Sequence, residues 1–230
     1  MRPRILFQGS HRARASRRDT PEQLEVARSI AKELGDVIIS RGFELILTNA
    51  GSIAADVGLA AVAACERLGV DPRERIRTYP HGPGAESAAG FGMVLQPADR
   101  RWREVRTSVV VEADAVIALL GGKGTSDCLQ KAVLARKPVF PIPIAGGAAR
   151  LEWERLRAAK YSNTERGDLD FLSDRSLGQR ELAVAVADRI AKLVAPRSPS
   201  FSKRIFWSTV TTVGSRTNSH DFWQNSTLSR

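Results

Sequence analysis

Short apolar runs alternate with longer helical patterns along residues 1–195, and this alternation constrains the fold more than any other feature of the chain. The runs are too short for helices, whereas the segments between them repeat their apolar residues at helical spacing. Such an order favours right-handed crossovers between parallel strands. We therefore predict an α/β fold: a Rossmann-like, doubly wound, mainly parallel sheet with helices on both faces. The predicted strands are residues 4–7, 44–48, 75–79, 115–120 and 138–144.

The first predicted helix has the clearest start signal. Thr20 is a candidate N-cap, Pro21 suits the first helical position, and Gln23 stands where its side chain can reach back to the cap. An apolar stripe from Leu24 to Ile38 follows on one face of this helix. We predict further helices over residues 53–68, 102–112, 125–136, 151–160 and 179–194, and a long loop over residues 80–92.

The composition changes after residue 195. Residues 196–230 are rich in Ser and Thr and contain no Ala or Glu, although both are frequent before them. This segment is basic and lacks a continuous apolar periodicity, so we predict a poorly ordered tail there and a single domain over residues 1–195.

Charge, cysteine usage and hydropathy limit the classes of partner. The net charge of +10 favours anionic partners such as nucleotides, nucleic acid or an acidic membrane surface. The two cysteines, Cys65 and Cys128, and the three histidines lack the spacing of a zinc site, so we predict no metal and no cofactor. There is no apolar run long enough for a signal peptide or a transmembrane segment, and we expect a cytoplasmic location.

A glycine-rich turn, GGKGT at residues 121–125, follows the apolar run at 115–120 and opens a predicted helix. Glycines permit positive φ and a close approach of a phosphate, and the helix N-terminus adds partial positive charge. The turn is not a P-loop, because glycine and not serine or threonine follows the lysine, and it lacks the third glycine of a dinucleotide fingerprint. The alternative is a tight turn without a ligand. The predicted ligand-binding residues here are Gly121, Gly122, Lys123, Gly124 and Thr125.

Two other loops follow strands that should end at the same edge of the sheet. Gly9 and Ser10 follow the first predicted strand, and Asn49 and Gly51 follow the second. Ligands of doubly wound sheets bind at this edge, so we include these residues in the predicted site. Between Ser10 and Thr20 the chain carries four arginines, which predict either phosphate recognition, with Arg12 as a ligand residue, or a solvated basic loop. These arginines are Arg12, Arg14, Arg17 and Arg18.

Several segments together resemble a known superfamily. Residues 114–125 (DAVIALLGGKGT), with KPVFP at 137–141 and AGGA at 145–148, resemble the SLOG superfamily of nucleotide sensors and Lonely Guy (LOG) cytokinin-activating hydrolases. With the loops at residues 9–10 and 49–52, the resemblance spans nearly all of residues 3–194. It implies a Rossmann-like sheet, a homo-oligomer, and a nucleotide or nucleotide derivative bound by the glycine turn.

LOG enzymes cleave the N-glycosidic bond of nucleoside monophosphates through a PGGxGTxxE motif and an arginine on the preceding helix. In this chain Leu120 replaces the proline and Cys128 replaces the glutamate. The resemblance makes Arg106 and Asp127 the candidate catalytic residues, although Asp127 is one residue early and turned by about 100° on a helix. Arg106 is alternatively a solvated helix residue, and Glu112 either orients it or caps the helix end. We interpret Cys128 as a small packed side chain rather than a nucleophile.

Our leading functional hypothesis is the binding or sensing of a nucleotide-derived small molecule, with a separate effector protein as partner. Hydrolysis develops positive charge on the ribose, which a neutral thiol at Cys128 does not stabilise. The alternative is a LOG-like nucleotide phosphoribohydrolase that uses Asp127 or Glu86. Nucleic-acid binding ranks last, because residues 1–195 contain no known reader motif and no basic stripe interleaved with aromatic residues.

Overall fold

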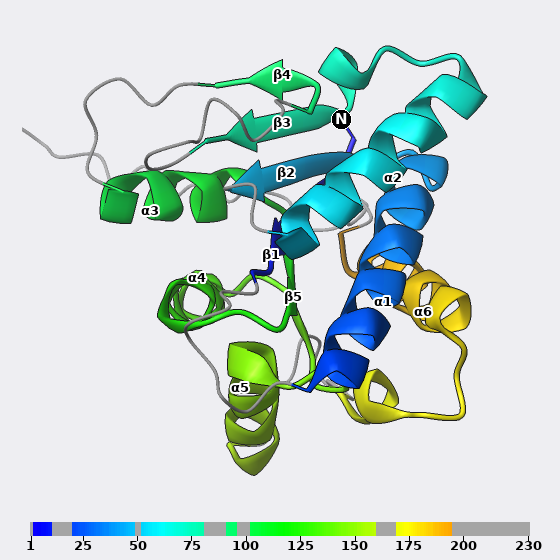
Figure 1. The fold of residues 1–230 in the computed structure, drawn as a ribbon. Coiled ribbons are helices and arrows are strands. Elements are labelled where there is room, and N and C mark those ends of the chain that lie inside the picture. The colour runs from blue at the N-terminus through cyan, green and yellow to red at the C-terminus, as the bar shows by residue number, and fades with distance from the viewer. Residues whose placement is uncertain are drawn as a thin grey trace, which may run out of the picture. The chain divides into compact units, whose positions relative to one another are not determined.

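The computed structural model describes residues 2–10, 20–48, 52–80, 91–95, 102–159 and 169–194. Within them six strands form one sheet in the order β4-β3-β2-β1-β5-β6, and every neighbouring pair is parallel (Figure 1). The predicted α/β fold with a parallel sheet is confirmed. The strands are β1 (Arg4–Gln8), β2 (Glu44–Thr48), β3 (Ile76–Tyr79), β4 (Met93–Val94), β5 (Ala115–Leu119) and β6 (Val139–Ile142).

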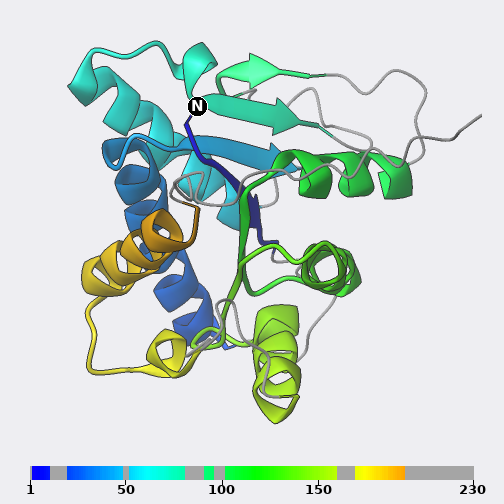
Figure 2. The ribbon, with the colours of Figure 1, turned by 180° about the vertical axis from the view of Figure 1, so that it is seen from behind.

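Helices cover both faces of the sheet, as Figures 1 and 2 show. On one face α1 (Pro21–Ser40) packs against α2 (Ser52–Leu68) and α6 (Gln179–Val194). On the other face α4 (Lys123–Leu134) lies between α3 (Trp102–Glu112) and α5 (Gly147–Ala158). Two short 3₁₀ helices, η1 (Pro72–Glu74) and η2 (Asp170–Ser173), complete the described elements.

Helix α1 begins as its sequence predicts. The Thr20 hydroxyl accepts a hydrogen bond from the Gln23 backbone N–H at 3.3 Å, and the Gln23 side-chain oxygen accepts one from the Thr20 N–H at 3.0 Å. This reciprocal cap satisfies two backbone donors that the helix itself leaves unpaired. Further along, the absence of a side chain at Gly35 brings α1 close to α2, because a Cβ there would collide with the Val57 carbonyl oxygen.

The core lies on both sides of the two central strands. All five residues of β5 are buried, as are the last four of β1, which explains why both read as uninterrupted apolar runs. Among the described strands β6 pairs with β5 alone, and it contains Pro141. Proline has no N–H for the ladder, and an edge strand tolerates this loss.

Two helices begin earlier than predicted, and one strand was not predicted. Helix α4 begins at Lys123, two residues earlier than expected, and α5 begins at Gly147, four residues earlier. Strand β4 was not predicted; it follows the expected loop and pairs with β3. Helix α5 starts early because Gly146 and Gly147, at φ of 90° and 66°, form a turn that L-residues rarely adopt. Residues 81–90 of the expected loop and the predicted tail lie outside the described residues.

Among the described helices, none is long and apolar enough to cross a membrane. The same residues contain no group of three or more His, Cys, Asp or Glu side chains arranged to hold a metal ion. All three histidines of the chain lie outside the described ranges.

Candidate functional site

The strand order reverses between β1 and β5, which are neighbours at the centre of the sheet. From β1 the chain winds outward through β2 and β3 to β4, and from β5 it winds the other way to β6. Such a reversal leaves a crevice beyond the carboxyl ends of the two strands, where doubly wound folds bind ligands. Gly9 and Ser10 follow β1 there, and the glycine turn follows β5.

A backbone hydrogen bond joins the two loops at this crevice. The Gly121 N–H donates to the Ser10 carbonyl oxygen at 3.1 Å. Gly9 lies against the end of β5, because a Cβ on it would come within 2.8 Å of the Leu119 carbonyl oxygen. The structure therefore brings together two of the three predicted loops; Asn49 and Gly51 of the third lie outside the described residues, as does Arg12.

The positive φ angles of the glycine turn lie at its start. The left-handed conformations fall on Leu120 at φ of 56° and Gly121 at φ of 83°, whereas Gly122 has a φ of −131°. Thr125, which is buried, packs so closely under Gly121 that a Cβ there would collide with its side chain. At Gly122 a Cβ would meet no atom within 4 Å, so Gly122 borders open space.

Helix α4 starts at this turn without a side-chain cap. Gly122 is the N-cap, and its carbonyl oxygen accepts from the N–H groups of Thr125 and Ser126 at 3.0 and 3.1 Å. The earlier N–H groups of the first turn belong to Lys123 and Gly124. They point out of the helix end at the crevice, together with the positive end of the helix dipole.

Two cations and one carboxylate lie beside the start of α4. Oδ2 of Asp127 is 3.3 Å from Nε of Arg106 on α3 and 2.8 Å from Nζ of Lys131 one turn further along α4. Gly124 makes room for the arginine, since a Cβ there would come within 2.9 Å of Nη1 of Arg106. The side chains are 20% (Arg106), 32% (Asp127) and 20% (Lys131) exposed. Asp127 thus turns toward Arg106 rather than away from it.

The structure agrees with the interpretation of Cys128 but not with a role of Glu112 in orienting Arg106. Cys128 is fully buried, and burial raises the pKa of its thiol to about 12, so it is a packed neutral side chain, as interpreted from the sequence. Glu112 does not orient Arg106. Glu112 is the last residue of α3, and it accepts hydrogen bonds from two residues of β3, Tyr79 at 2.7 Å and Arg77. Glu112 is six positions after Arg106 on the helix, a rise of about 9 Å.

Sequence reasoning missed a buried carboxylate next to the turn. Glu152 on α5 is 5% exposed and accepts hydrogen bonds from Ser126, from Gln130 at 2.9 Å and from Arg155 at 2.7 Å. Burial would raise the pKa of Glu152, but these hydrogen bonds outweigh it and hold the pKa below its ordinary value. Hydropathy did not indicate that Glu152 is buried, because the charged Glu152 is buried while its apolar neighbour Leu151 is 67% exposed.

Comparison with known proteins supports the fold. No protein-family model matches the sequence, and no curated protein is significantly similar to it. Among solved structures, the chain is similar to TM1055, with 17% identity and a TM-score of 0.53 over 71% of this chain and 88% of that one.

Two further solved structures are similar at lower scores. The molybdenum cofactor carrier protein of Chlamydomonas reinhardtii has 16% identity and a TM-score of 0.48, over 84% of this chain and 99% of that one. The molybdenum cofactor binding protein of Rippkaea orientalis has 18% identity and a TM-score of 0.43, over 60% and 75%. The sheet topology and the likeness to TM1055 together establish a Rossmann-type α/β fold.

Proposed function

We propose that this chain is a binding module of the SLOG type, which binds or senses a small nucleotide-derived anion at the glycine turn. One observation carries the proposal: at the β1 and β5 switch point an uncapped helix start lies beside two cations. The first N–H groups of α4 and its dipole favour a phosphate. Arg106 and Lys131 outnumber the carboxylate of Asp127, and the exposed Lys123 adds a further positive charge at the mouth.

The same geometry favours binding over hydrolysis. A LOG-like hydrolase needs a carboxylate that faces the ribose, where positive charge develops. The carboxylate of Asp127 is paired with two cations, and that of Glu152 is held by three donors. Cys128, at the position of the family's glutamate, is buried and neutral. We therefore propose a sensor, whose signal would pass to a separate effector protein or a second copy of the chain.

Calorimetry with AMP and adenosine tests the proposal, with free adenine measured by chromatography in the same samples. We expect AMP to bind at least about tenfold more tightly than adenosine, because only AMP carries the phosphate. We expect no adenine to be released. Arg106→Gln should weaken AMP binding, whereas Arg103→Gln, at an exposed position on the same helix, should not.

Two outcomes would overturn this function. Equal affinities for AMP and adenosine would show that the site does not recognise the phosphate. Adenine release that follows the concentration of the protein would make the chain a hydrolase. A steep loss of affinity for nucleic acid with added salt, in the absence of any AMP binding, would instead support the nucleic-acid alternative.

A further inference from the structure

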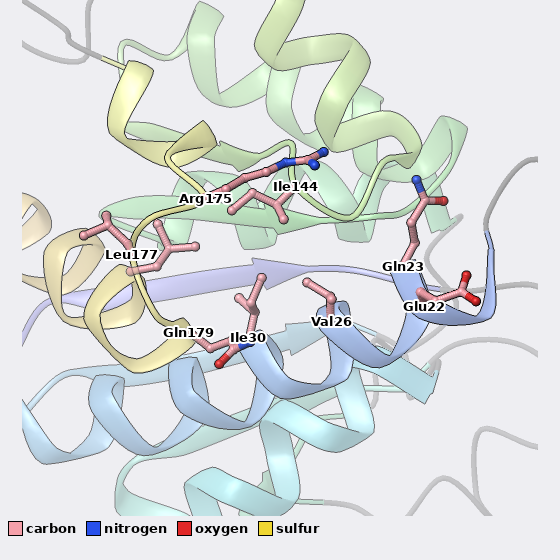
Figure 3. Close-up of a pocket in the computed structure, with 9 residues that line it drawn as sticks. Glu22, Gln23, Val26, Ile30, Ile144, Arg175, Leu177 and Gln179 are labelled. Atoms are coloured by element: carbon pink, nitrogen blue, oxygen red, sulfur yellow. The ribbon is translucent and has the colours of Figure 1, made fainter.

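A cavity of about 320 Å³ lies on the face of the sheet covered by α1 and α6 (Figure 3). Its walls come from the start of α1, from Ile144 after β6, and from the segment that leads into α6. The volume is at the lower end of the range for small-molecule sites. We propose that this pocket binds a small amphipathic molecule with a single carboxylate, distinct from the ligand of the glycine turn.

The floor of the pocket is aliphatic and is built from three separate segments. Ile30 and Leu182 are each 1% exposed and form part of the main core. The other three side chains are only partly buried and pack against that core, so an apolar ligand body would cover their remaining surface. The floor consists of Val26, Ile30, Ile144, Leu177 and Leu182.

The rim presents donors suited to one carboxylate. Arg175 extends over Ile144 in Figure 3, and none of the ion pairs among the described residues involves it. The Gln23 side chain points to the same side of the pocket, and its oxygen is already engaged by the Thr20 N–H, which leaves its NH₂ group to donate. A guanidinium fork and an amide donor match the two oxygens of a carboxylate.

The charge of the rim disfavours a ligand with more than one negative charge. Glu22 lies on the rim with Gln23, and the hydrogen bond from the Thr20 side chain lowers the pKa of Glu22, which is therefore ionised near neutral pH. The guanidinium of Arg175 and the ionised Glu22 leave the rim without net charge, so a ligand with one negative charge is repelled less than a phosphate dianion. The glycine turn differs, because two cations and a free helix end meet there.

Calorimetry of the full chain with 2-naphthoate and the uncharged 2-naphthamide tests this proposal. We expect both to bind, with naphthoate the tighter. Arg175→Gln should weaken naphthoate about fivefold or more and leave naphthamide unchanged, because only the charged head group uses the guanidinium. Val26→Trp should abolish binding of both probes by filling the pocket, since Val26 is partly exposed within it.

Two control variants match these changes at remote surfaces. Arg73→Gln removes an exposed arginine on η1, and Leu134→Trp adds an indole at a position that is 83% exposed on α4. Circular dichroism checks that each variant folds. Excess AMP should leave naphthoate binding unchanged, which separates this pocket from the glycine turn. Naphthoate binding that fails in the natural protein, competes with AMP, or survives both Arg175→Gln and Val26→Trp would overturn the proposal.

Discussion

The carboxylate of Asp127 lies 3.3 Å from the guanidinium Nε of Arg106 and thereby connects α4 to α3 at the mouth of the glycine turn. Arg106 Nε is buried and makes no hydrogen bond among the described residues, so the contact with Asp127 is an ion pair with imperfect alignment. A phosphate with better geometry would compete with this carboxylate for the arginine. Asp127 therefore competes with the proposed ligand for Arg106.

Asp127→Asn should strengthen AMP binding by about threefold to tenfold. The substitution removes a negative charge that occupies Arg106 and Lys131, while it keeps the size of the side chain. Calorimetry measures the affinity. The control is Asp188→Asn, which removes an acid of the opposite helical layer that pairs with Arg41. Weaker AMP binding in Asp127→Asn, or an adenine release that this variant abolishes, would favour a catalytic carboxylate.

Gly122→Val should abolish AMP binding and leave the fold intact. A Cβ at Gly122 meets no protein atom within 4 Å, and its φ of −131° is open to any residue, so folding loses little. The added methyl groups would occupy the space over the helix start that a phosphate needs. Calorimetry and thermal melting measure the two effects. Ala135→Val, at the other end of α4, is the control, and undiminished AMP affinity in Gly122→Val would exclude this turn as the phosphate site.

Cys128→Glu should destabilise the protein and should not create a hydrolase. The position is fully buried, so a carboxylate there loses its hydration, at a cost of roughly 2 to 4 kcal/mol in the free energy of unfolding at neutral pH. Cys128→Gln has nearly the same size without the charge and should cost less. The difference between the two variants should shrink in acid, where the glutamate is protonated. Urea unfolding at two pH values measures it, and an active, stable Cys128→Glu would contradict the burial.

Glu152→Gln should lower stability at neutral pH by roughly 1 to 3 kcal/mol, because the charged carboxylate accepts hydrogen bonds from Ser126, Gln130 and Arg155. The folded-state pKa of Glu152 is below its ordinary value of 4.5. Its contribution is therefore complete above 4.5 and is lost as the pH falls through the lower folded-state pKa.

The natural protein and Glu152→Gln should converge in stability below that pH. Urea unfolding from neutral to acid conditions follows the convergence. Glu154→Gln on the same helix is the control, because the Glu154 side chain is 46% exposed and pairs with Arg150 at the surface. A difference that stays constant with pH would show that the charge of Glu152 contributes nothing to the free energy of unfolding.

Deletion of residues 196–230 should leave the melting temperature almost unchanged. The segment has no continuous apolar periodicity, so we expect it to add little to the core. Calorimetric melting of the full and shortened chains measures the effect. A drop of many degrees would mean that its aromatic residues pack on the domain and that the predicted boundary is wrong.

Local sequence patterns determined most of the fold. The spacing of Thr20, Pro21 and Gln23 determined the start of α1, because a capping box is made within four residues. The apolar runs at β1 and β5 identified the central strands, since a strand buried on both faces has no polar alternation. The parallel order followed from the alternation of such strands with helices.

Tertiary packing decided the details of the candidate site. The sequence identified a glycine turn but not its conformation. Positive φ falls on Leu120 and Gly121, where the Gly121 N–H donates to the Ser10 carbonyl oxygen and Thr125 packs under Gly121. In the same way, the N–H of Ala149 donates to the Leu120 carbonyl oxygen and fixes the start of α5 on the turn.

The orientation of α5 shows the physical reason. With its start fixed, the helix buries Glu152 and exposes Leu151, the reverse of their hydropathies. Two of the three residues that donate to the Glu152 carboxylate, Ser126 and Gln130, come from α4, which is more than twenty residues away in the chain. Asp127 likewise finds Arg106 only because α3 and α4 lie side by side. Propensity and periodicity act over a few neighbouring residues, whereas these contacts join segments that meet only in the folded protein.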